Sequence, residues 1–309
     1  MRRVVVTGVG LTTPLGVGQK INQEKLFNAK SGISKISAFD TENFACKIAG
    51  QIPLGDKEGE FSFDSVANPK ERRRMDDFIV YGLSACEEAI ADSGWEAKTE
   101  EDKNRAGVLV GSGIGGLKSL LDYATILREQ GPRRVSPFFI PASLINLLSG
   151  HISIRHKLQG PNHAVVTACA SGTHAIGDAA RLIMLDDADV MVAGGAEAPV
   201  NELGVAGFMA ARTLSTGYND TPEIASRPWD TGRDGFVMGE GAGILVLEEY
   251  EHAKNRGAKI YGEIIGYGMS GDAYHITSPA PEGAGGRRSM EAALRNAKIN
   301  IFYRTAHLA

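Results

Sequence analysis

The stretch that decides the fold is AVVTACASGTHAIGDAARLIML, at residues 164–185. Its first five residues, 164–168, are β-branched or small, which is typical of a buried strand. The apolar spacing after Cys169 predicts a helix that ends near Leu185. Cys169 is therefore expected where a strand runs directly into a helix, among neighbours small enough for a sharp turn and for close approach of a substrate.

Two interpretations of Cys169 follow from this position. At a helix N-terminus, free N–H groups and the positive end of the dipole stabilise a thiolate and can bind a developing oxyanion. Strand, nucleophile and helix in this order also form the nucleophile elbow of serine hydrolases, here with sulfur in place of oxygen. The alternative is structural, because a tight junction needs small residues and Cys is small. Spacing alone leaves both open, and it assigns none of the seven histidines as a base.

The surrounding chain alternates short β-branched runs with amphipathic stretches, which predicts an α/β fold. The helix expected over 76–91 buries Ile79, Leu83, Cys86 and Ile90 on one face, and Gly94 ends it. A strand followed by Gly-x-Gly occurs at 4–10 and again at 260–268, which suggests a duplicated fold. Further strands are expected at 3–7, running into a turn at 8–10, and at 105–110, 190–193 and 244–247, with a further helix at 117–127.

The other two cysteines are explained by periodicity. Cys86 lies on the apolar face of its predicted helix, and Cys46 alternates with Phe44 and Ile48 on a predicted strand. Both are predicted to be structural. Three cysteines are too few and too scattered for a disulfide framework or a Cys-rich zinc site. We therefore expect no metal and a reducing compartment, either a bacterial cytoplasm or an organellar matrix.

Composition excludes several classes of protein. The chain has 309 residues, of which 43% are hydrophobic and 23% charged, with a formal net charge of −4. These values are those of a globular domain, and no global positive charge points to nucleic acid or an anionic membrane. No run approaches the roughly 20 apolar residues of a membrane helix, and the N-terminus lacks the apolar region of a signal peptide.

Two local features carry competing interpretations. Residues 111–116, GSGIGG, match the G-x-G-x-x-G pattern of dinucleotide-binding turns, but no strand ending in an acidic residue follows about 20 positions later. The plainer interpretation is a turn that closely approaches another backbone or a substrate, so no cofactor is predicted. The basic cluster Lys70, Arg72, Arg73 and Arg74 is either a solvated helix entry or a docking site for an acidic partner.

The combination of several stretches resembles the β-ketoacyl-acyl-carrier-protein synthases of the type II elongating class. The resemblance runs from residue 2 to about 298. The matching stretches, in chain order, are RRVVVTGVGLTTPLG, VLVGSGIGGL, SPFFIPASLINLLSGHISI, GPNHAVVTACASGTHAIGDAARLI, ADVMVAGGAEA, RPWDTGRDGFVMGEGAGILVLEE and YGMSGDAYHITSPAPEGAGG.

The resemblance implies a thiolase-like α/β fold, with duplicated βαβαβαββ halves stacked as α-β-α-β-α layers. Residues 1–255 would form the N-terminal half with the nucleophile, and 256–309 an incomplete start of the C-terminal half, with an atypical tail from about 299. It also implies a homodimer that acts in fatty acid synthesis. The expected partner is acyl carrier protein, and no binding to nucleic acid or to a membrane is expected.

The resemblance further implies an acyltransferase that performs a decarboxylative Claisen condensation. Cys169 matches the family's nucleophile and would take an acyl group from acyl carrier protein as a thioester. Malonyl-carrier protein would then lose carbon dioxide, and its enolate would attack the acyl-cysteine to give 3-oxoacyl-carrier protein. Ile114 and Phe208 match positions that line the family's acyl pocket.

The same resemblance assigns two surfaces. Phe138 and Phe139 match the segment that approaches the dimer partner. The positions that match the basic face for the carrier protein are Lys70, Arg73, Arg74, Arg133, Arg134 and Arg212.

The tail departs from the family pattern. The family places its two histidines, a lysine and a closing glycine loop in the C-terminal half. His307 is near the first of these positions but lacks the Gly-Thr that follows it in the family, so it receives no role. We therefore expect this chain alone to retain acyl transfer to Cys169 at most. The alternative is a non-catalytic or acylation-only chain that dimerises with an intact copy.

Overall fold

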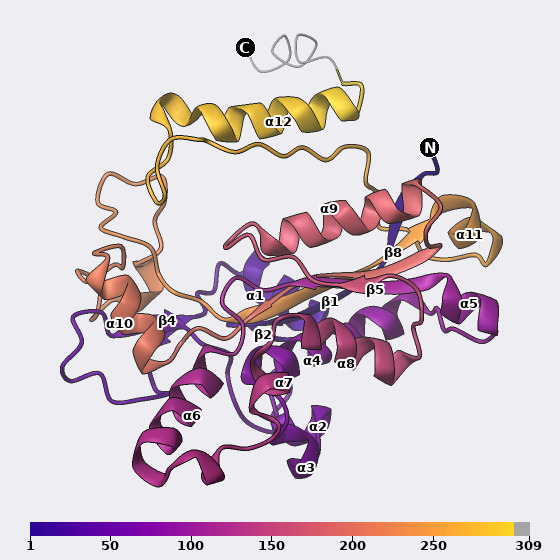
Figure 1. The fold of residues 1–309 in the computed structure, drawn as a ribbon. Coiled ribbons are helices and arrows are strands. Elements are labelled where there is room, and N and C mark those ends of the chain that lie inside the picture. Colours follow the sequence, from indigo (N-terminus) through magenta and orange to yellow (C-terminus); the bar gives the residue numbers. More distant parts are fainter. Residues whose placement is uncertain (300–309) are drawn as a thin grey trace.

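A mixed β-sheet with helices on both faces forms the centre of the molecule (Figure 1). The computed structural model describes residues 1–299. The strands are β1 (Val4–Thr13), β2 (Gly16–Val17), β3 (Ile33–Lys35), β4 (Ile48–Gly50), β5 (Ala106–Gly111), β6 (Asn162–His163), β7 (Val190–Glu197), β8 (Gly241–Glu249) and β9 (Gly262–Glu263).

The α-helices fall between these strands as the alternating pattern predicts. They are α1 (Gln19–Phe27), α2 (Phe63–Val66), α3 (Pro69–Arg72), α4 (Asp77–Ser93), α5 (Glu100–Asn104), α6 (Leu117–Gln130), α7 (Phe139–Ser143), α8 (Asn146–His156), α9 (Ser171–Met184), α10 (Glu202–Ala210), α11 (Tyr250–Asn255) and α12 (Ala284–Asn296). The helix predicted over 76–91 is α4, and Gly94 ends it in the left-handed conformation.

The main sheet has the order β2-β1-β8-β7-β5-β6, and β9 also pairs with β1. Strands β5, β6 and β7 run parallel, whereas β8 is antiparallel to both β7 and β1. The carboxyl ends of β5 and β7 therefore meet at one edge of the sheet, with Gly111 beside Gly195. In open α/β sheets this edge is the usual place for a ligand site.

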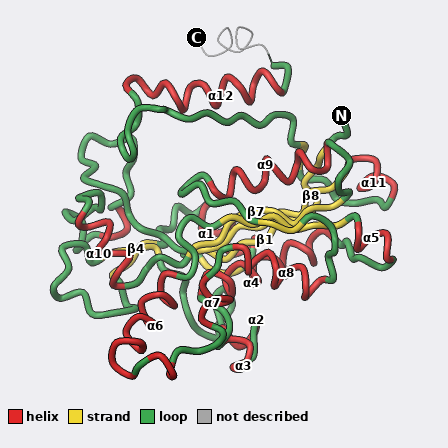
Figure 2. The backbone as a smooth tube through the Cα atoms, in the orientation of Figure 1, coloured by secondary structure: helices red, strands yellow, loops and turns green. Residues whose placement is uncertain are grey.

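Helices cover the sheet in layers (Figures 1 and 2). Helices α4 and α8 pack on one face, and α9 packs on β7 and β5 from the other. One apolar core fills each interface, around Phe78 and Leu83 on the α4 side and around Ile183 and Leu109 on the α9 side. Helix α12 lies outward of α9, so the order is helix, sheet, helix, helix (Figure 1). Burial of these apolar faces is what holds the layers together.

The first strand is longer than the sequence predicts. Gly8 and Gly10 were expected in a turn, but both lie inside β1, which continues to Thr13. A Cβ atom at Gly8 would overlap the carbonyl oxygen of Ala89, and one at Gly10 would overlap that of Ala85. These glycines let α4 lie directly on the strand rather than turning the chain.

The same close approach recurs in the second Gly-x-Gly segment. A Cβ at Gly266 would overlap the carbonyl oxygen of Ala293 in α12, and one at Gly268 would overlap that of Ser289. In each Gly-x-Gly segment, the two carbonyl oxygens that the glycines approach belong to helix residues four positions apart, which is about one helical turn. The repeat seen in the sequence therefore extends to packing, although only β9 forms a strand there.

Among residues 1–299, no helix combines the length and the apolar character needed to cross a membrane.

Candidate active site

Cys169 lies directly before helix α9, as the sequence predicts, but the strand predicted at 164–168 is not formed. Of residues 162–168, only Asn162 and His163 form a strand, β6, which pairs with β5, and residues 164–168 are irregular. The reason is local bonding in place of a strand ladder. The Ser171 hydroxyl accepts the Thr167 amide at 2.9 Å and donates to the Ala168 carbonyl at 2.8 Å.

The backbone before Cys169 is held in a conformation rare for a residue with a side chain. Ala168 has φ +51°, in the left-handed region. For a residue with a side chain, this conformation costs about 1–2 kcal/mol of free energy, which the surrounding contacts must offset. This turn presents Cys169 outward at the start of α9, as in a nucleophile elbow.

The three cysteines differ in accessibility in the way the sequence predicts. Cys46 is 1% exposed and Cys86 0%, whereas Cys169 is exposed. Burial raises the pKa of the Cys86 thiol and that of Cys46, which keeps both in the unreactive protonated form. Cys46 precedes β4 rather than lying in a strand. Within residues 1–299, Cys169 alone has a thiol that a substrate can reach.

The structure brings Cys169, Ile114 and Phe208 together around one cavity of about 710 Å³. Ile114 comes from the turn after β5, and Phe208 from α10, where its ring packs edge-on against Phe236 at 5.3 Å between centroids. The walls are mostly apolar side chains and glycine backbone. Such a cavity suits an apolar chain whose reactive end lies at the cysteine.

Two acidic residues that the sequence reasoning missed also line this cavity, Glu197 at the end of β7 and Glu240 just before β8. Each lies at a strand end on the side of the sheet where Cys169 lies. The signal in the sequence is an acidic residue at one end of a strand-like run: Glu197 ends the run 190–197, and Glu240 directly precedes the run 241–249. That signal becomes specific only when the strand order is known.

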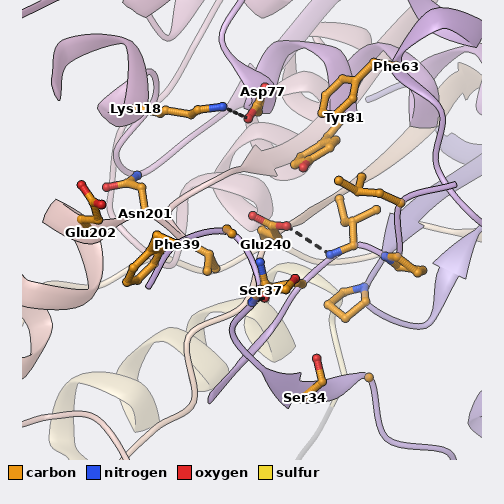
Figure 3. Close-up of a pocket in the computed structure, with 18 of the residues that line it drawn as sticks. Ser34, Ser37, Phe39, Phe63, Asp77, Tyr81, Lys118, Asn201, Glu202 and Glu240 are labelled. Carbon is orange, nitrogen blue, oxygen red and sulfur yellow. Dashed lines mark hydrogen bonds and ion pairs between the residues drawn. The ribbon is translucent and has the colours of Figure 1, made fainter. Parts of the chain in front are cut away.

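Glu240 and Pro14 also line a second cavity of about 770 Å³ (Figure 3). The Glu240 carboxylate accepts the Ile52 amide at 3.1 Å, and Lys118 pairs with Asp77 on the cavity wall at 3.1 Å. Burial, assisted by the negative charge of Asp77, raises the pKa of Glu240 from an ordinary 4.5 to about 7. A carboxyl group that titrates near neutral pH thus lies where the two cavities meet.

No histidine is paired with Cys169 in the part of the chain that the structure describes. His174 is on α9, and its Nδ1 lies 2.8 Å from the Thr167 hydroxyl. His252 pairs instead with the buried Glu248. His307 is outside the described residues. Among residues 1–299, no three His, Cys, Asp or Glu side chains are arranged to hold a metal ion.

The basic residues lie on three elements. Lys70 and Arg73 are exposed at α3, and Arg133 and Arg134 are exposed in the 3₁₀ turn after α6. The Arg74 guanidinium lies over the Phe138 ring at 4.3 Å, which places α3 beside the segment that follows Arg134. Phe139 packs on Tyr123 of α6. Arg212 is exposed after α10, with φ +55°.

Models of two domains match almost the whole chain. The model for "Beta-ketoacyl synthase, N-terminal domain" matches residues 1–253, and that for "Beta-ketoacyl synthase, C-terminal domain" matches residues 261–307. The chain belongs to the beta-ketoacyl synthase family. The resemblance noted in the sequence is thereby confirmed.

Individual proteins of this family are similar over nearly the full chain. The 3-oxoacyl-[acyl-carrier-protein] synthase 2 of Rhizobium meliloti (strain 1021) is 56% identical over 311 residues, covering 99% of this chain and 74% of that protein. A beta-ketoacyl synthase from Burkholderia phymatum STM815 has a TM-score of 0.83 at 34% identity, covering 97% of this chain and 71% of that one.

A further solved relative is a ketosynthase in complex with its type II PKS acyl-carrier protein. It has a TM-score of 0.84 at 30% identity and covers 97% of this chain and 71% of that one. These likenesses confirm the thiolase-like α/β fold that the resemblance implied.

Proposed function

We propose that this chain is a condensing enzyme of fatty acid elongation, in which Cys169 carries the growing acyl chain. The observation that carries the proposal is the position of Cys169, exposed at the start of α9 and on the wall of a largely apolar cavity. Ile114 and Phe208 line that cavity as the acyl-pocket residues. The identity to proteins named 3-oxoacyl-[acyl-carrier-protein] synthase 2 supports the same reaction.

The first step is acyl transfer. The Cys169 sulfur attacks the thioester carbonyl of an acyl-carrier protein, forming a new C–S bond as the carrier's C–S bond breaks. The carrier thiol leaves with the proton that Cys169 gives up. Small residues around the turn let the carbonyl approach, and the N-terminal end of the 14-residue α9 favours the negative charge that develops on the oxygen.

The second step forms the new carbon–carbon bond. Malonyl-carrier protein releases carbon dioxide, and the enolate attacks the acyl-Cys169 carbonyl. The thiolate is expelled, and 3-oxoacyl-carrier protein leaves with a chain two carbons longer. Donors that stabilise the enolate oxygen are required for this step, because charge accumulates there as the carboxylate departs.

The partner in both steps is acyl carrier protein, which is acidic in this proposal. Lys70 on α3, Arg73 and Arg74 directly after it, and Arg133 and Arg134 in the segment that leads to Phe138 provide positive charge that suits it. Arg212 is proposed as a further contact. We also propose a homodimer, with Phe138 and Phe139 in the segment facing the partner, located in a bacterial cytoplasm or an organellar matrix.

The test incubates the chain with acyl- and malonyl-carrier proteins and measures the masses of both the chain and the carrier. We expect an acyl group on Cys169 of the wild-type chain and neither acyl-enzyme nor product with Cys169→Ala, and 3-oxoacyl-carrier protein from the wild-type chain alone would extend the function to the second step. Acyl transfer without elongated carrier would restrict the function to the first step. Product from Cys169→Ala would overturn the assignment of the nucleophile.

A further inference from the structure

The turn between β5 and α6, which matches the nucleotide-binding pattern, already surrounds a negative charge. Oε1 of Glu197 accepts the Ser112 hydroxyl at 2.7 Å and the Gly115 amide at 3.0 Å. Oε2 accepts the Gly113 amide at 2.5 Å and the Ile114 amide at 3.1 Å. Successive N–H groups in such a turn form a concave anion site. The Glu197 carboxylate occupies this site as a phosphate does in nucleotide-binding proteins.

This contact joins two neighbouring strand ends. Glu197 is the last residue of β7, and the turn follows β5, its parallel neighbour. The donors are three backbone amides and one hydroxyl, all uncharged. Hydrogen bonds to a charged acceptor are the stronger kind, about 1.5–3 kcal/mol each. The carboxylate therefore fixes the shape of a turn that contains four glycines and would otherwise be loose.

The turn also packs directly on the backbone that carries the nucleophile. A Cβ atom at Gly113 would lie 3.2 Å from the Ala168 carbonyl oxygen, and one at Gly111 only 2.7 Å from that of Ser171. The only large side chain in the turn, Ile114, lines the same cavity as Cys169. Any movement of the turn therefore changes the cavity wall and the support beneath Cys169 together.

We propose that Glu197 is a positioning residue for acyl transfer: its carboxylate fills the anion site of the 111–116 turn and so holds Ile114 as the cavity wall beside Cys169. This inference rests on the proposed function, since it concerns the acyl chain that Cys169 accepts. It also explains why the G-x-G-x-x-G match does not indicate a nucleotide site, because an internal anion takes the phosphate position.

The test compares two substitutions at Glu197. Glu197→Ala removes the anion, and Glu197→Gln keeps the shape of the side chain with one accepting oxygen. We expect E197A to slow acylation of Cys169 by roughly tenfold or more. We also expect a changed ratio of rates for medium-chain and long-chain acyl groups, because Ile114 is released. The acylation rate of E197Q should lie between those of E197A and the wild type. The matched control is Glu223→Ala, which removes an exposed acid.

Chemical rescue separates this role from a general loss of stability. Formate is a small carboxylate that fits the vacated site of E197A. It should raise the Tm of E197A and restore part of the acylation rate, relative to chloride at equal ionic strength. Wild type, E197Q and E223A should not respond, because their turn remains filled.

The proposal is overturned if E197A acylates at the wild-type rate and chain-length ratio, or if folded E197A ignores formate. Should E197A fail to fold, an unchanged rate and ratio in E197Q would overturn it, and changed values would support it. A wild-type chain that does not acylate Cys169 would contradict the proposed function instead. The Tm response of E197A to formate would still decide whether the anion site exists.

Discussion

At the scale of single residues, the proposed chemistry depends on a thiol that is exposed on a rigid backbone. Cys169 is exposed, but Ala168 before it is held at φ +51° and Ser171 after it is bonded on both sides of the turn. A nucleophile fixed in this way loses little entropy when the substrate docks, which favours reaction. The periodicity that predicted burial of Cys46 and Cys86 left Cys169 as the remaining candidate.

Glu240 gives a prediction on pH. Its pKa is raised by burial to about 7, so the fold favours the neutral carboxyl. That stabilisation is present below the ordinary pKa of 4.5 and is lost as the pH rises through 7. Glu240→Gln should therefore raise the free energy of unfolding at pH 8, by at most about 3 kcal/mol. The gain should vanish near pH 4.5, as measured by urea unfolding at both pH values.

The matched control is Glu202→Gln, an exposed acid on the rim of the same cavity (Figure 3). It should change stability by less than about 0.5 kcal/mol at either pH. A gain for E240Q that is equal at pH 4.5 and pH 8 would show that Glu240 is not the titrating group.

Glu197 and Glu240 show where sequence reasoning stops at this scale. Each role depends on a neighbour far along the chain. Glu197 accepts the amide of Gly113, 84 residues earlier, and Glu240 accepts the amide of Ile52, 188 residues earlier. Local patterns predict which residues are buried or exposed. They do not predict which polar groups meet, because that follows from strand order.

At the scale of elements, glycine determines how closely helices approach the sheet. Gly10→Ala places a methyl group on the Ala85 carbonyl of α4, where the strand and helix already touch. Overpacking of this kind should lower the free energy of unfolding by about 3 kcal/mol. Urea unfolding with an unchanged m-value would measure it.

Gly262→Ala is the control, because a Cβ there meets nothing within 4 Å. It should change stability by less than about 0.5 kcal/mol. Equal stability of the two variants would mean that α4 does not require close contact with β1.

Element boundaries were the least predictable part of the fold. Helix α4 was predicted well, since its apolar face and its Gly94 cap are both local signals. Strand β1 was predicted too short, because glycines that signal a turn here permit close packing. The strand predicted at 164–168 was wrong, because side-chain bonds to the backbone replace the ladder there, and the edge strand β6 ends at His163.

At the scale of the whole molecule, the site exists because distant segments meet at one edge of the sheet. The cavity draws on β1, the turn after β5, the start of α9, α10 and the approach to β8. The α/β class could be predicted from alternation alone. The order of the strands could not, because β1 pairs with β8, more than two hundred residues later, through tertiary packing.

The basic surface gives a prediction at this scale. Reversing charge at two exposed positions, Lys70→Glu with Arg73→Glu, should raise KM for acyl-carrier protein by roughly tenfold and leave kcat unchanged. Acylation by a small acyl thioester without the carrier should be unaffected, because Cys169 and its cavity are untouched. Steady-state kinetics with both donors at low salt would measure this.

Lys20→Glu with Lys30→Glu is the matched control, since both lysines are exposed around α1. It should leave KM for the carrier protein within about twofold, because charges distant from a contact are screened. Equal losses in the two double variants would exclude a local docking surface on α3.

The measurement that tests the central claim most directly is the intact mass of the chain after incubation with a long-chain acyl-carrier protein. One acyl group should be added to the wild-type chain, localised to Cys169 by peptide mapping, and no thioester should form on Cys169→Ala. A folded wild-type chain without the adduct, or an adduct on another residue, would contradict the assignment of Cys169 as the acyl-carrying nucleophile.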